Sequence, residues 1–139
     1  TYSPGHSPSV VAFGGDFALS ESSTLHIELG GTELGDYDQL VVSGDVNLDG
    51  NLVVELLDGF SLNGGVFDII VNTGDTFGTF NGLDEGDVVG SFNGFDLMIN
   101  YLAGDGNNVA LFATPEPSAL LGVLGMLLLA AAGRRRRKR

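Results

Sequence analysis

An internal repeat is the feature that most limits how this chain can fold. The segment around Gly15 recurs around Gly44, at an offset of 29, and the segment around Leu25 recurs around Leu52, at an offset of 27. Short apolar alternations joined by Gly-Asp corners at such a period are typical of stacked β-coils, in which each coil buries its inward side chains against the next. The sequence therefore predicts two such coils.

Strand periodicity predicts which side chains of the two coils face inward. Successive residues of a strand point to opposite faces, so alternate apolar residues share one face. Glu28 and Glu55 fall on the other face, where their carboxylates stay in water. The predicted buried set is Leu25, Ile27, Leu29, Leu40, Val42, Val46, Leu48, Leu52, Val54 and Leu56.

After Leu57 the repeat fades and the pattern becomes one of hairpins. Turn residues that tolerate positive φ separate two pairs of apolar segments, 66–71 from 77–80 and 95–102 from 109–112. No long segment of helical period precedes Ser118, and most of the 22 glycines lie at corners. Residues 1–114 are therefore predicted to form an all-β body, either a short β-helix (solenoid-like) or a β-sandwich of repeated strands.

Residues 115–139 form a second unit that begins with Pro115-Glu116-Pro117. Both prolines lack a backbone donor and hold φ near roughly −65°, so this tripeptide is predicted to be extended and accessible to an enzyme. An apolar helix is predicted over 118–133. Its core, 119–132, rises about 21 Å, which is less than the roughly 30 Å hydrocarbon core of a bilayer. The helix should therefore insert only marginally.

The chain ends in a basic block that predicts its orientation in a membrane. Six consecutive cations resist translocation and favour the anionic inner leaflet, which leaves residues 1–114 outside. These residues are Arg134, Arg135, Arg136, Arg137, Lys138 and Arg139.

The motif Pro115-Glu116-Pro117, followed directly by the apolar run and the arginines, resembles the carboxy-terminal sorting signal called PEP-CTERM of exported bacterial proteins. The resemblance implies that an exosortase, a transpeptidase-like cysteine protease of the membrane, processes the chain. It also implies an inner-membrane intermediate held through 118–133, and a mature protein in the cell envelope, at the surface or in the extracellular matrix. An ordinary tail anchor is the alternative interpretation, which the short apolar span disfavours.

The charge distribution excludes one class of partner. All Lys and Arg lie within 134–139, so the rest of the chain carries a formal charge of −18 and the whole chain −12. Such a body repels nucleic acid and anionic membrane. Its length suits a single domain. Cysteine is absent, which is compatible with export but does not by itself indicate a compartment.

The body also resembles autotransporter-like passenger repeats of bacterial surfaces. Three segments carry this loose, glycine-biased resemblance: 3–8, 37–40 and 104–107. It implies a role at the cell surface. Because no charged-then-apolar leader precedes Tyr2, we expect the chain to be a fragment of a longer exported protein.

The body offers few residues for catalysis, and we expect no enzyme. His6 lies in a proline-flanked leader, His26 lies on the predicted solvent side of a strand, and neither Cys nor Lys is present in the body to act as a nucleophile. Ser7 or Ser43 could be paired with His26 only arbitrarily. No cofactor is predicted.

Calcium is the one ligand for which the sequence offers candidate residues. Asp45, Asn47 and Asp49, followed by Gly50, match the opening of an EF-hand or dockerin loop, where oxygens at alternate positions wrap the cation. Position twelve of such a loop should be a bidentate carboxylate and is Leu56 here. A coil corner that has acquired polar residues explains the match equally simply.

Two functions remain open. In the first, the chain is an exported structural or adhesive protein of the envelope, sorted through its C-terminal signal, with extracellular polysaccharide as a candidate partner. In the second, it is a non-catalytic segment that presents an enzyme or carbohydrate-binding domain located upstream. Further repeats of the same period upstream would favour the first function.

Overall fold

The computed structural model describes residues 2–4 and 8–116 and shows an all-β protein. The helix predicted over 118–133 and the basic block lie outside the described residues. The strands are β1 (Val10–Phe13), β2 (Phe17–Ala18), β3 (Thr24–Leu29), β4 (Gln39–Val42), β5 (Val46–Leu48), β6 (Asn51–Leu56), β7 (Val66–Asn72), β8 (Thr76–Gly78), β9 (Val88–Phe92), β10 (Phe95–Ala103) and β11 (Asn108–Pro115).

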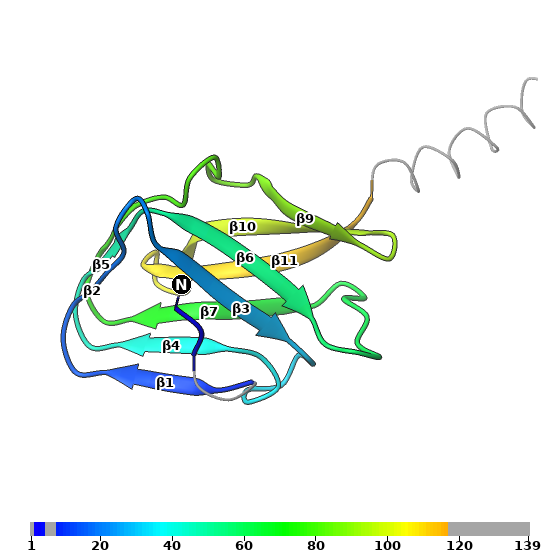
Figure 1. The fold of residues 1–139 in the computed structure, drawn as a ribbon, viewed down its shortest axis with the longest axis horizontal. Coiled ribbons are helices and arrows are strands. Elements are labelled where there is room, and N and C mark those ends of the chain that lie inside the picture. Colours follow the sequence, from blue (N-terminus) through cyan, green and yellow to red (C-terminus); the bar gives the residue numbers. More distant parts are fainter. Residues whose placement is uncertain (1, 5–7, 117–139) are drawn as a thin grey trace, which may run out of the picture.

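The first eight strands wind in successive turns, which we call coil 1 (β1, β2, β3), coil 2 (β4, β5, β6) and coil 3 (β7, β8). Equivalent strands of neighbouring coils pair in parallel: β1 with β4 and β4 with β7, β2 with β5 and β5 with β8, and β3 with β6. Figure 1 shows β1, β4 and β7 side by side, with the β3–β6 pair crossing in front of them.

The pairing register confirms the predicted repeat. Val10 pairs with Gln39 at an offset of 29, and Leu25 pairs with Leu52 at an offset of 27. The predicted hairpin between 66–71 and 77–80 is wrong, because β7 and β8 pair with β4 and β5 instead of with each other. After Asn72 the chain continues into β8, which pairs with β5, instead of folding back on β7. The turn residues therefore form the corner of a third coil.

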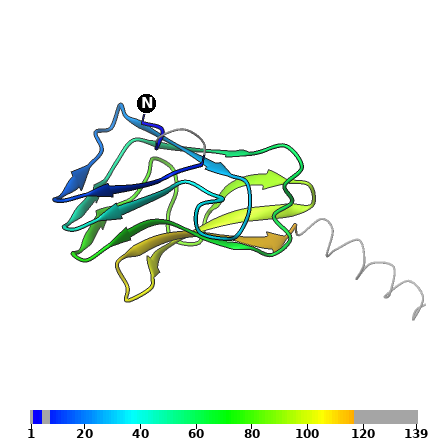
Figure 2. The same cartoon turned by 90° about the horizontal axis from the view of Figure 1, so that it is seen from below.

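The second predicted hairpin is confirmed and closes one end of the stack. Strands β10 and β11 pair antiparallel, and β11 adds to the free side of β7, also antiparallel. The resulting six-stranded sheet has the order β1-β4-β7-β11-β10-β9. In Figure 2 the colours run from blue β1 through β4 and green β7 to golden β11, and then return to yellow-green for β10 and β9.

One hydrophobic core lies between the β3–β6 pair and the large sheet. Of the predicted buried set, the members in β3, β4 and β5 are buried: Leu25, Ile27, Leu29, Leu40, Val42, Val46 and Leu48. The members in β6, Leu52, Val54 and Leu56, are only half-buried, contrary to the prediction. Coil 3 has no third strand to pair with β6, so β6 is the outer member of its two-stranded sheet. Glu55 is exposed as predicted, whereas Glu28 is half-buried.

The corners between the first and second strands of the coils are joined by a line of carboxylates, which we call the corner ladder. The Asp45 N–H donates to Asp16 Oδ1 at 2.8 Å, and the Asp75 N–H donates to Asp45 Oδ1 at 2.9 Å. Each Gly-Asp corner therefore satisfies the backbone of the next one. Such bonds explain why the Gly-Asp pair recurs with the coil period.

Candidate functional site

The motif Pro115-Glu116-Pro117 begins at the last residue of strand β11. Strand β11 finishes at the exposed Pro115, which lies opposite Phe95 of β10, and the Glu116 N–H donates to the Gly94 carbonyl at 3.0 Å. Pairing of β11 with β7 stops earlier, at Phe112 and Val66. Pro115 therefore has a neighbouring strand on one side only, which suits a residue without an N–H.

The extended conformation predicted for this motif is confirmed at Pro115. Pro117 and the six basic residues of the tail lie outside the described residues. Within residues 2–4 and 8–116, no helix is long and apolar enough to cross a membrane. Strand β11 therefore leads directly into the motif.

The calcium candidates occupy the outer face of one extended segment. Asp45 and Asp49 flank β5, and Asn47 lies in its middle with an exposed side chain, while Val46 and Leu48 point inward. Alternate residues of a strand are about 6.6 Å apart, so the three side chains are spread along a line and do not wrap one point. Asp45 Oδ1 accepts the Asp75 N–H, and Asp49 Oδ1 accepts the Gly50 N–H. The described residues contain no group of three or more His, Cys, Asp or Glu placed to hold a metal ion.

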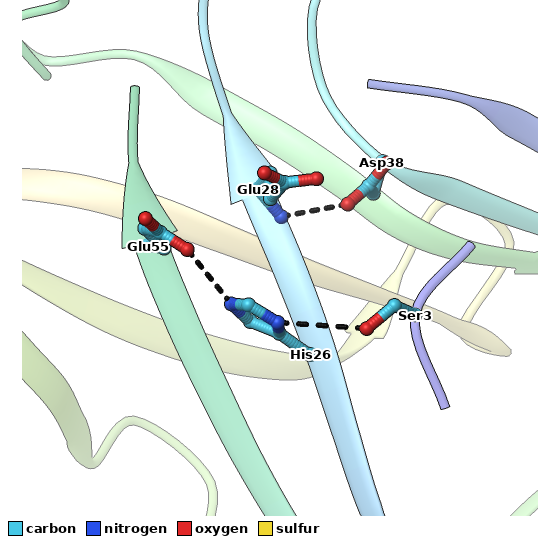
Figure 3. A network of polar contacts seen from close by, with 5 residues as sticks. All are labelled: Ser3, His26, Glu28, Asp38 and Glu55. Carbon is cyan, nitrogen blue, oxygen red and sulfur yellow. Dashed lines mark hydrogen bonds and ion pairs between the residues drawn. The ribbon is translucent and has the colours of Figure 1, made fainter. Parts of the chain in front are cut away.

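A polar network crosses the outer face of β3 and β6 (Figure 3). His26 Nε2 lies 3.1 Å from Glu55 Oε2, and Ser3 Oγ lies 3.5 Å from His26 Nδ1. Residues 2–4 reach this position because Tyr2 bridges to Leu25 in parallel: the Tyr2 N–H donates to the Thr24 carbonyl and the His26 N–H to the Tyr2 carbonyl. The network therefore connects three segments of the chain.

Among the described residues, the serine that contacts His26 is Ser3, which the sequence did not indicate. Ser7 and His6 lie outside the described residues, and Ser43 is exposed at the end of β4. The order serine, histidine, glutamate is that of a hydrolytic triad, but the Ser3–His26 contact is at the limit of a hydrogen bond and the side chain of Glu55 is 56% exposed. The nearby amides of Tyr2 and His26 are engaged in strand pairing, so they cannot form an oxyanion hole. What this geometry does is hold the N-terminal segment to β3.

Asp38 supports the same region from beneath. Its carboxylate is fully buried and accepts the Ser9 N–H at Oδ1 and the Glu28 N–H at Oδ2, both at 2.8 Å. Burial raises the pKa of Asp38, and the two N–H donors partly offset this rise. Asp38 therefore links Ser9, which directly precedes β1, to Glu28 in β3.

The network could have been found in part from the sequence. An offset of 27 places His26 opposite Val53 and Glu28 opposite Glu55, so His26 and Glu55 are diagonal neighbours on one face. Ser3 gave no such signal, because residues 2–4 pair with β3 at a different offset. Comparison of the chain with protein-family models, with curated proteins and with solved structures finds no match.

Proposed function

We propose that the chain is an exported structural protein of a bacterial envelope, whose body is a short β-solenoid and whose C-terminal signal is processed by an exosortase. The solenoid interpretation is favoured over a sandwich by the parallel pairing of equivalent strands at offsets between 27 and 30. In stacked coils of this kind each coil contacts only its neighbours, so the body extends in one direction and presents an elongated surface.

The observation that carries the proposal is the position of Pro115. It is exposed and lies three residues beyond Phe112, the last residue at which β11 pairs with both neighbouring strands. A protease that cuts close to Pro115-Glu116-Pro117 would release the tail without removing any core residue, since the last buried core side chain is Ala113. This arrangement supports a signal that is separable from the body.

Acidity supports the same proposal. The body, residues 1–114, has a formal charge of −17, which keeps it soluble and repels anionic membrane, so retention depends on the basic tail until cleavage. We expect each tail cation to contribute on the order of 1 kcal/mol of attraction to anionic lipid.

The test is mass spectrometry of the envelope form, produced behind an export signal in a host that has an exosortase and in a matched strain that lacks it. The mature protein should lack residues after about Pro117 in the first host only, because the proposal assigns this cleavage to the exosortase. The apolar span is shorter than the bilayer core and should not serve as a lasting anchor of the mature protein. A mature surface protein from the host with the exosortase that still yields a peptide ending at Arg139 would contradict the proposal.

Two tail variants separate charge from side-chain chemistry. Replacing all six basic residues by neutral ones should abolish orientation and processing, as reported by protease accessibility and gel mobility. Replacing the five arginines by lysine should keep orientation, because the charge is unchanged. A neutral tail that is oriented and cleaved normally would show that charge does not direct sorting.

A further inference from the structure

The two ends of the corner ladder differ in whether other residues cover them. At the coil 3 end, the turn of the β10–β11 hairpin covers the corner: Asn107 Nδ2 donates to the Gly74 carbonyl at 2.8 Å, and Asn108 Oδ1 accepts the Asn72 N–H at 3.1 Å. Thr76 Oγ1 donates to the Asn107 carbonyl. This end of the stack is therefore closed by side chains.

At the coil 1 end, no such cover is seen among the described residues. Strands β1 and β2 are the outer members of their sheets. The Phe17 and Leu19 amides donate inward to coil 2, at the Asp45 and Asn47 carbonyls. Because backbone groups alternate along a strand, the Asp16 and Ala18 groups point outward, as do those of Val10 and Ala12 in β1. Coil 1 presents an open parallel edge.

The glycines at the corners indicate which group would contact this edge. At Gly44, an added Cβ would collide with Asp16 Oδ1, and at Gly74 it would collide with Asp45 Oδ1, so each glycine makes room for the carboxylate of the preceding coil. Gly15 occupies the equivalent place in coil 1. Nothing in the described part of the chain lies within 4 Å of its Cβ position, and its φ lies outside the range that favours glycine. Neither packing nor backbone conformation in coil 1 requires a glycine at this position.

The pairing of Tyr2 indicates where a preceding coil would lie. Tyr2 pairs with Leu25 in parallel, as Leu52 does from the other side of β3, so Tyr2 already occupies the third-strand position of a preceding coil. Its ring packs on Phe13 and Phe17 with centroid distances of 5.9 and 6.1 Å. If the chain that precedes Tyr2 wound in the same direction as coils 1 and 2, it would run first along the edge of β1 and then along the edge of β2.

We propose that the open edge of β1 and β2 is an interface for one more coil of the same polypeptide, which carries an Asp at its corner and runs directly into Tyr2. The carboxylate of that corner accepts the Asp16 N–H and fills the space left by Gly15. The interface continues the contact already made twice, between coils 1 and 2 and between coils 2 and 3. It does not depend on how the tail is processed.

The direct test extends the full chain by a copy of residues 39–51 in place of Thr1, so that Tyr2 takes the place of Leu52 in the copied coil. The control is an extension of the same composition in shuffled order. Hydrogen exchange at the Asp16 amide should slow by about tenfold or more with the copied coil and not with the shuffled one, because a new hydrogen bond must open first. Equal exchange in the two proteins would overturn the proposal.

Alanine substitutions provide a second reading. In the unextended chain, Gly15→Ala should leave the melting temperature unchanged, whereas Gly44→Ala should lower it by roughly 5 °C or more. In the extended chain, Gly15→Ala should become as costly as Gly44→Ala. If Gly15→Ala has the same effect in both chains, the glycine does not serve a neighbouring coil and the proposal fails.

The unextended chain supplies a reading that does not depend on folding of the extension. Its Asp16 amide should exchange faster than the Asp45 and Asp75 amides, whose acceptors are in place. Equal protection of the three amides would contradict an open edge. Protection of Asp16 that rises with protein concentration, together with a dimer in sedimentation, would assign the edge to a second copy and would also overturn the proposal.

Discussion

Tyr101 joins the closing hairpin to the chain that leads into it. Its hydroxyl donates to the Leu83 carbonyl at 2.7 Å and accepts the Phe80 N–H at 3.0 Å, while its ring lies beside that of Phe80. Burial raises the pKa of Tyr101 to about 12, and the nearby carboxylates Asp84, Glu85 and Asp87 act in the same direction. One side chain thus satisfies two backbone groups of a segment that has no strand of its own.

Tyr101→Phe should cost about 1 to 3 kcal/mol of unfolding free energy, because the buried Phe80 N–H loses its acceptor. The folded state holds the phenol proton more tightly than the unfolded chain, whose tyrosines titrate near pH 10. The stability that Tyr101 contributes is therefore complete below about pH 10 and is lost as the pH rises toward 12. Urea unfolding measures the first effect, and tyrosinate absorbance measures the second. The absorbance step near pH 12 should vanish in Tyr101→Phe and persist in Tyr2→Phe; its persistence in Tyr101→Phe would contradict the assignment.

At the scale of elements, the β3–β6 pair shows how position in the stack sets the importance of a side chain. Ile27 and Val54 are direct partners across the pair. Ile27 is fully buried, whereas Val54 is half-buried because β6 has no strand beyond it. Val53, the neighbour of Val54 on the outer face, is 47% exposed.

Aspartate substitutions in this pair should therefore follow an order. Ile27→Asp should unfold the protein, since an unpaired buried carboxylate costs several kcal/mol against a total of about 5 to 15. Val54→Asp should destabilise less, and Val53→Asp should change the midpoint little. Urea denaturation followed by circular dichroism gives the three midpoints. An Ile27→Asp protein that is as stable as Val53→Asp would refute the strand register described here.

The sequence predicted coils 1 and 2 because their apolar alternation repeats closely, as Leu25 and Leu52 illustrate. Coil 3 was missed because its pairing offset changes to 30, as between Leu40 and Ile70, and because no third strand follows β8. Its signal was nevertheless present, since Gly74-Asp75 repeats Gly44-Asp45. In the polar network, the contact of Ser3 could not be predicted, because it depends on a bridge at Tyr2 that breaks the period.

At the scale of the molecule, charge opposes compactness. All 18 carboxylates lie within residues 16–116, whereas all six basic residues lie in 134–139. Among the described residues, the contact between His26 and Glu55 is partly exposed and is an ion pair only when His26 is protonated. Mutual repulsion of the carboxylates should therefore lower the stability of the body at neutral pH and low salt.

The melting temperature should consequently rise from about 10 mM to about 500 mM NaCl, because salt shortens the range of repulsion from roughly 30 Å to below 10 Å. It should also rise as the pH is lowered from 7 toward the folded pKa of Asp38. Burial holds the pKa of Asp38 above its unfolded value, so the folded state gains stability as the pH falls through the folded pKa. Scanning calorimetry measures both effects. The triple variant Glu21→Gln, Asp58→Asn, Asp105→Asn should show a weaker salt dependence, and a melting temperature that falls with added NaCl would contradict this account.

The position of β11 also has a mechanical consequence. This last strand lies between β7 and β10, and both neighbours run antiparallel to it. Antiparallel hydrogen bonds lie perpendicular to the strands, so tension applied through Glu116 along β11 loads many of them at once, in shear. A strand at the edge of the sheet, pulled sideways, would instead lose its bonds one after another. The fold therefore attaches its tail at a point suited to bear a pulling force.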